Sequence, residues 1–108
     1  MSGPTHGRRI AFARVAAAAL NNAETIAAQW LPDGRREGAE WVARNPLRND
    51  RNRGSFKVNL RTGRWGDFAL GSDARGGDLV SLAGYLFNLR QADAALRVAE
   101  MLGVDPYE

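Results

Sequence analysis

Residues 54–78 of this chain read GSFKVNLRTGRWGDFALGSDARGGD, and they predict a β-hairpin, a loop and the start of a helix. Apolar and polar side chains alternate from Phe56 to Arg61, which is the pattern of a strand with one buried and one solvated face. The chain then turns at residues 61–63, where Gly63 can adopt the left-handed conformation of a short hairpin loop. Residues 64–69 return as the second strand. This two-stranded ribbon is the centre of the expected fold.

Two further features of the stretch bear on its local geometry. Trp65 and Phe68 are three residues apart, which breaks strict alternation, so we expect a β-bulge near Gly66. Gly76–Gly77 then releases the chain into a helix, and Asp78 is placed to cap the first turn of that helix.

Helices are predicted on both sides of the hairpin. An alanine-rich segment at 8–30 has helical propensity and is interrupted at Asn21 and Asn22. The other predicted elements are a loop at 31–38, a short strand at 40–44, a polar loop at 45–53, a loop at 70–77, and helices at 78–89 and 91–102, the last ending at Gly103. Together they predict an α+β fold, with a small antiparallel sheet of about three strands flanked by N-terminal and C-terminal helices.

Length and composition bound the class of protein. We expect a single domain over 108 residues, with a helical segment and loop at 1–37, a β core at 38–77 and a helix pair at 78–108. No apolar run approaches the ~18 residues of a membrane span, and the start lacks a signal peptide, so we expect a cytoplasmic protein without a membrane partner. The chain has no cysteine and one histidine, which predicts no disulfide, metal site or cofactor.

Positive charge is concentrated in one part of the chain. The window from Arg35 to Arg64 holds nine basic and three acidic residues, whereas the remainder holds six basic and nine acidic residues. Fourteen of the fifteen bases are arginine, whose planar guanidinium suits phosphate. A basic sheet beside acidic helices is typical of a surface that binds a polyanion, although a merely solvated face is the alternative.

Seven residues are candidates for contact with nucleic acid, because arginine and lysine bind phosphate and an aromatic ring can stack on an unpaired base. They are Arg48, Arg51, Arg53, Lys57, Arg61, Arg64 and Trp65. For the basic residues the alternative is an ordinary solvated side chain. For Trp65 the alternative is packing in the core, and for Phe68 core packing is the favoured interpretation.

A set of short motifs lies between Trp41 and Val104. They are Asn45–Pro46, Gly54–Ser55–Phe56, Lys57–Val58, Trp65, Gly76–Gly77–Asp78, Ala94–Ala95 and Leu102–Gly103. Together they resemble the N-terminal zinc-finger domain of bacterial and phage DNA primases. In that family a Cys-Pro-x-His segment precedes a Pro-Ser-Phe strand, the hairpin ends in Cys-x-x-Cys, and a glycine-rich turn leads to a helix that begins with aspartate. The resemblance implies a zinc-ribbon-like core and a template-binding role in a primase or helicase of a phage or mobile element.

The chain departs from that family at the metal ligands. Asn45 and Arg48 stand where the family has its first cysteine and its histidine, and residues 67–71 contain no thiol. Structural zinc needs four cysteine or histidine ligands, so the resemblance is to a variant without zinc. Buried aromatic rings can supply comparable stability, and we expect four of them to pack where the metal would lie: Trp41, Phe56, Trp65 and Phe68.

These observations predict a non-catalytic module that holds single-stranded DNA through the basic, aromatic face of the hairpin. The alternative is a protein-interaction module that docks onto a primase or helicase partner through the helices at 78–102. An enzyme is the least favoured class, since the sequence offers no paired carboxylates at a plausible spacing, no phosphate-binding loop with lysine and no nucleophile with a base.

Overall fold

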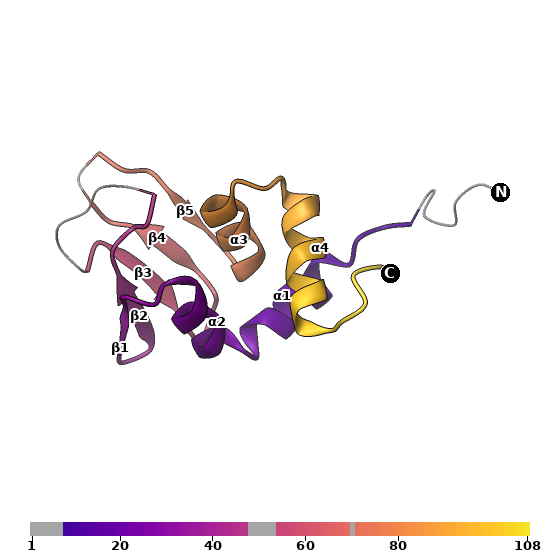
Figure 1. The fold of residues 1–108 in the computed structure, drawn as a ribbon, viewed down its shortest axis with the longest axis horizontal. Helices are drawn as coiled ribbons and strands as arrows, with labels where there is room; N and C mark the ends of the chain where they lie inside the picture. Colours follow the sequence, from indigo (N-terminus) through magenta and orange to yellow (C-terminus); the bar gives the residue numbers. More distant parts are fainter. Residues whose placement is uncertain (1–7, 48–53, 70) are drawn as a thin grey trace.

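The computed structural model describes residues 8–47, 54–69 and 71–108, and these ranges contain four helices and five strands. In chain order they are α1 (Phe12–Leu20), α2 (Ala23–Trp30), β1 (Arg35–Glu37), β2 (Glu40–Ala43), β3 (Phe56–Asn59), β4 (Trp65–Asp67), β5 (Arg75–Gly76), α3 (Leu79–Phe87) and α4 (Gln91–Leu102). Figure 1 shows the sheet at one end of the molecule and α1 and α4 toward the other, with α2 and α3 between them. The predicted α+β class is confirmed.

The five strands form one antiparallel sheet in the order β1-β2-β3-β4-β5, so each strand pairs with its neighbour in sequence. The prediction of about three strands was therefore too low. The two missed strands are the edges β1 and β5, inside segments predicted as loops. β1 is exposed along its whole length and β5 has two residues, so neither shows the apolar alternation that identifies a strand.

The register of the hairpin is regular. Phe56 pairs with Asp67, Lys57 with Gly66 and Val58 with Trp65. No extra residue interrupts β4, so the bulge predicted near Gly66 is wrong. In a regular strand, residues an odd number of positions apart lie on opposite faces, and Trp65 and Phe68 are three apart.

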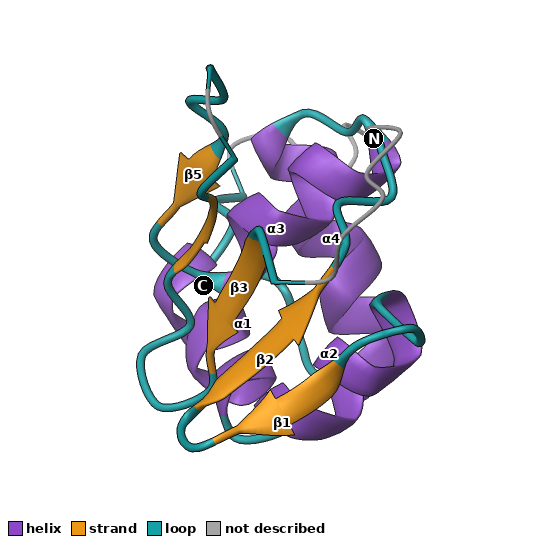
Figure 2. Cartoon of the chain, turned by 90° about the vertical axis from the view of Figure 1, so that its left-hand side faces the viewer, coloured by secondary structure: helices purple, strands orange, loops and turns teal. Residues whose placement is uncertain are grey.

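This register divides the side chains between two faces of the sheet. Trp41, Val58 and Trp65 occupy one cross-strand row, and Val42, Lys57, Gly66 and Arg75 occupy the next row. In Figure 2 the described helices lie behind the sheet. We call the helix-covered face the inner face and the other face the outer face; no described helix covers the outer face.

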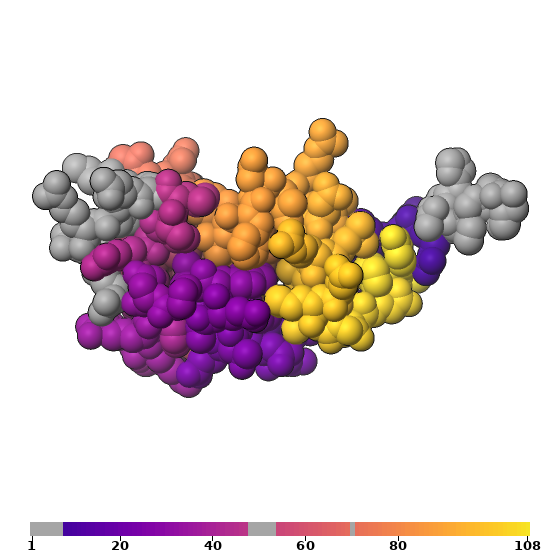
Figure 3. Space-filling model, viewed as in Figure 1, coloured from indigo at the N-terminus to yellow at the C-terminus, as the bar shows by residue number. Residues whose placement is uncertain are grey.

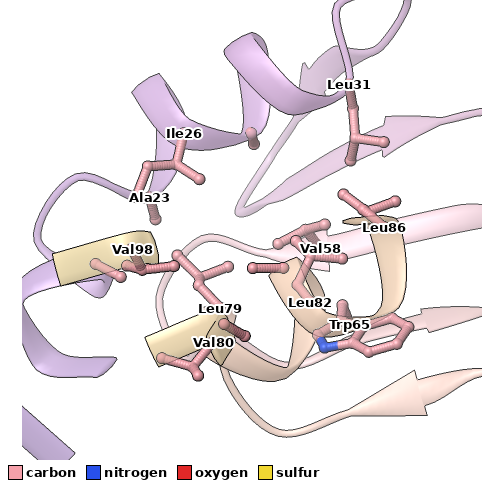
Figure 4. Packing of buried hydrophobic residues seen from close by; sticks show 14 of the residues in the cluster. Ala23, Ile26, Leu31, Val58, Trp65, Leu79, Val80, Leu82, Leu86 and Val98 are labelled. Carbon is pink, nitrogen blue, oxygen red and sulfur yellow. The ribbon is translucent and has the colours of Figure 1, made fainter. Parts of the chain in front are cut away.

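The core lies between the inner face and the helices. Figure 4 shows Leu82 of α3 close to Val58 and Trp65 of the sheet, and Val98 of α4 beside Leu79 of α3. The same cluster includes Val15, Ala19, Ile26 and Leu31 from the N-terminal segment, so all three predicted segments contribute to one core. Burial of this apolar surface is the main favourable contribution to folding.

Local sequence signals are confirmed at four boundaries. Asn21 and Asn22 separate α1 from α2. Asp78 accepts the backbone N–H of Ser81 at 2.8 Å, and the Ser81 hydroxyl accepts the backbone N–H of Asp78, which completes a capping box. Left-handed glycines close the hairpin turn and end α4, with φ of 80° at Gly63 and 71° at Gly103.

The segments at the two ends of the described chain lie side by side. Ile10 forms an antiparallel bridge with Tyr107, and the Arg14 guanidinium donates to the Tyr107 carbonyl at 2.6 Å. Figure 3 shows the first described residues, in indigo, against the C-terminal segment, in yellow.

None of the helices in the described ranges combines the length and the apolar character needed to cross a bilayer.

Candidate nucleic-acid interface

Phe68 and three basic residues surround Gly66 on the outer face. Lys57 and Arg75 are the cross-strand neighbours of Gly66 on its two sides, and Arg64 precedes it by two residues. The Lys57 ammonium nitrogen lies 5.7 Å from the centre of the Phe68 ring. We call Lys57, Arg64, Phe68 and Arg75 the open-face patch.

Phe68 lies over the sheet instead of in the core, with 70% of its surface exposed. A Cβ atom built on Gly66 would lie 3.3 Å from the Phe68 Cζ atom, so the ring rests where a side chain would otherwise stand. A pocket of about 350 Å³ adjoins the ring. Arg64, Phe68 and Arg75 line it together with three glycines and Trp65.

The basic residues of the molecule differ in whether an acid neutralises them. In the ranges that the structure describes, Lys57, Arg61, Arg64 and Arg75 form no ion pair. Three other arginines of the basic window are paired: Arg35 with Glu37 at 2.9 Å, Arg36 with Glu24 at 2.6 Å and Arg44 with Asp33 at 3.9 Å. The positive window of the sequence is therefore neutralised at the β1 side of the sheet and unneutralised around the open-face patch.

The predicted site residues are distributed as follows. Lys57 and Arg64 belong to the open-face patch. Arg61 is exposed at the tip of the β3–β4 hairpin, in the turn that leads to Arg64. Arg48, Arg51 and Arg53 lie outside the described residues.

Trp65 is placed in the core, as the alternative interpretation had it. It is 7% exposed, and its ring centre lies 5.1 Å from that of Tyr85 and 5.8 Å from that of Phe56. The indole nitrogen donates to the Ser81 hydroxyl at 3.0 Å. With so little of its surface exposed, this ring offers a base little area for stacking, although Trp65 is also part of the lining of the pocket beside Phe68. The stacking contact predicted for Trp65 therefore stays a prediction.

Phe68 and Arg75 are the residues that sequence reasoning assigned wrongly or missed. We expected Phe68 to pack in the core with Trp41, Phe56 and Trp65, yet only those three are buried. The odd spacing of Trp65 and Phe68 was the signal, because without a bulge it places the two rings on opposite faces. Arg75 was left in a predicted loop, and its position became visible only from the pairing of β5 with β4.

The positions that the resemblance assigns to zinc ligands hold a polar network. The Asn45 side-chain amide donates to Asp67 Oδ2 at 2.8 Å and to the Tyr85 hydroxyl at 2.7 Å. Asn45 and Asp67 are both buried. With no cysteine in the chain, these residues do not fit a structural zinc ion, and the hydrogen bonds join the segments that such an ion would join.

A second hollow lies on the helical side of the molecule. It has a volume of about 470 Å³ and is lined by Trp30, Phe87, Arg97, Met101 and their neighbours. The Trp30 and Phe87 rings meet edge to face at 5.4 Å, and the Arg97 guanidinium lies 5.6 Å from the Phe87 ring centre. This groove has two aromatic walls, and Gln29, Arg97 and Glu100 add polar groups to its lining.

Neither the models of known protein families nor the curated proteins include one that this chain matches. The similarity to primase zinc domains therefore rests on the short motifs alone.

Proposed function

We propose that this chain is a non-catalytic module that binds single-stranded DNA, similar in role to the template-binding domain of DNA primases but without zinc. The observation that carries the proposal is the open-face patch, with three basic side chains that no described acid neutralises around an exposed phenylalanine. The proposed setting is a cytoplasmic primase or helicase, in which the module would hold the template near a catalytic domain.

The chemistry of the patch favours a flexible single strand over a duplex. Arginine and lysine would contact phosphates, and a ring that is open to solvent can stack only on a base that has left its own stack. The nearby turn adds Arg61, so a strand crossing β4 toward the hairpin tip would meet successive positive charges. Such contacts displace counterions from the nucleic acid, and binding then weakens as salt rises.

Titration of a labelled oligothymidylate by fluorescence anisotropy at two salt concentrations tests the proposal. About three phosphate contacts predict a slope near −2 for log affinity against log salt, or a roughly twentyfold loss between about 50 and 200 mM salt. Absence of binding at the lower salt concentration would reject the proposed function.

A double variant asks whether the hairpin arginines act on the ligand or on the fold. Arg61→Ala/Arg64→Ala should lower the affinity and reduce the salt slope by about 1.4, while the melting temperature stays unchanged, because neither side chain has an ion pair in the described part of the chain. Arg90→Ala, which removes an exposed arginine between α3 and α4, is the matched control and should bind like the unmodified protein.

The second candidate function is docking to a protein partner through the helices. It is favoured by one observation, the groove on the helical side with Trp30, Phe87 and Met101 in its walls. Two results together would favour this function over the first. The protein would associate with a primase or helicase catalytic domain in a way that is insensitive to salt and is lost in Phe87→Ala, and it would show no affinity for DNA.

A further inference from the structure

We infer that the pocket beside Phe68 receives one unstacked nucleobase of the bound strand, with Arg64 and Arg75 at the adjoining phosphates. This inference rests on the proposed function and sharpens it from a charged surface to a site for one nucleotide. Sequence reasoning placed the ring contact at Trp65, whereas the geometry assigns it to Phe68.

The size and the lining of the pocket suit a flat ring. Its volume of about 350 Å³ is at the lower end of the range of about 300–1,000 Å³ for small-ligand sites, which suits a single nucleotide. Gly66, Gly76 and Gly77 contribute to the lining and carry no side chain, so backbone forms much of the surface that a planar base would approach. Phe68 and Trp65 supply the aromatic part of the lining, and Phe68 is the one that is largely exposed.

The charge around the pocket fits the rest of a nucleotide. Arg64 and Arg75 line the pocket, and neither is paired with an acid among the residues described. The Lys57 ammonium group approaches Phe68, 5.7 Å from the ring centre, which adds positive charge at the same wall. An aromatic wall with cations beside it is the combination by which proteins hold a base and its phosphate together.

The experiment compares two strands of equal length and charge, an oligothymidylate and its abasic counterpart, by anisotropy at low salt. The unmodified protein should bind the thymidine strand roughly tenfold or more tightly than the abasic strand, because base stacking on an aromatic side chain contributes on that scale. Phe68→Ala should lose this discrimination by weakening only the thymidine complex. Phe68→Trp keeps an aromatic wall and should retain it.

The matched control is Phe12→Ala, which removes a partly exposed phenylalanine from α1, away from the sheet (Figure 1). It should preserve the discrimination. Because Phe68 is largely exposed, Phe68→Ala should unfold at the same temperature as the unmodified protein, and backbone amide NMR signals of Gly66, Gly76 and Gly77 should shift when the thymidine strand is added.

The outcomes distinguish a failure of the base pocket from a failure of the proposed DNA-binding function. Equal, salt-sensitive binding of both strands by the unmodified protein would overturn the base pocket and leave the charged interface in place. Discrimination that survives in Phe68→Ala would likewise overturn it. No binding of either strand at low salt would overturn the proposed function and the pocket together.

Discussion

The two edges of the sheet are built alike and charged differently. At the β1 edge Gly34 lies against Trp41, and at the β5 edge Gly76 lies against Trp65; a Cβ atom at either glycine would overlap the indole nitrogen. The arginines near β1 are paired with acids, whereas Arg75 on β5 has no such partner in the described ranges. The same glycine–tryptophan packing therefore occurs at both edges, although the arginines are ion-paired at the β1 edge and unpaired at the β5 edge within the described residues.

Local charge in a sequence does not by itself define a binding surface. The basic window contains both sets of arginines, and only the tertiary contacts separate them. An exposed ion pair costs little to break, but an arginine beside a carboxylate adds less net positive charge to its surface than an arginine without one. The proposed interface therefore lies at β4 and β5, where the positive charge is not balanced by a described acid.

The largest expected effect tests the shared construction of the edges. Gly34→Ala and Gly76→Ala should each destabilise the fold by about 1–3 kcal/mol, because the added methyl group displaces a buried tryptophan. Urea unfolding measures the loss. Gly77→Ala is the control, since a Cβ atom there meets nothing within 4 Å, and it should be nearly neutral. If either edge variant were as stable as the control, that edge would not depend on its glycine.

The next effect tests the difference in charge. Arg64→Ala/Arg75→Ala should weaken binding of an oligothymidylate by roughly tenfold at low salt, as expected for the loss of two phosphate contacts. Arg35→Ala/Arg36→Ala removes the same charge from the β1 edge and should leave the affinity nearly unchanged, because glutamates already balance both charges and this edge lies at the other side of the sheet from β5. Anisotropy titrations of the two variants measure the affinity of each for the oligothymidylate. An equal loss of affinity in both variants would contradict the distinction between the two edges.

A third prediction concerns how each tryptophan is held. The Trp41 indole donates to the backbone carbonyl of Leu31, which no substitution removes, whereas the Trp65 indole donates to the Ser81 hydroxyl. Ser81→Ala should therefore destabilise the β5 side by about 1–2 kcal/mol, since it leaves the indole without its acceptor and undoes half of the capping box. Thermal unfolding measures it, and Ser72→Ala, in the loop before β5, should change the stability far less.

The smallest effect tests the ion pairs themselves. Glu24→Gln breaks the exposed pair with Arg36 and should change the free energy of unfolding by less than about 0.5 kcal/mol. DNA affinity should rise by less than about twofold, the contribution of one distant charge in screening salt. A large gain in DNA affinity would show that the ion pair with Glu24 keeps Arg36 from binding DNA, and that the distance of the β1 edge from the open-face patch does not matter.

Features that depend on neighbouring residues can be predicted from the sequence. The break at Asn21 and Asn22, the cap at Asp78 and the stop at Gly103 each follow from the conformational preference of the residue concerned, and all appear where expected. The strand β3 follows from apolar alternation, which reports burial on one face, and β2 lies where a short strand was expected around Trp41 and Val42.

Features that depend on partners distant in the chain are visible only in the tertiary structure. β1 and β5 are strands because an adjacent strand pairs with them, and their own residues carry no such signal. The side taken by Phe68 depended on whether β4 contains a bulge, which the pairing with β3 settles. Which arginines are neutralised depends on acids up to twelve positions away, brought close by folding. Local conformational preferences depend on consecutive residues and can be predicted from them. Strand pairing and the neutralisation of arginines by acids arise only when folding brings separate segments together.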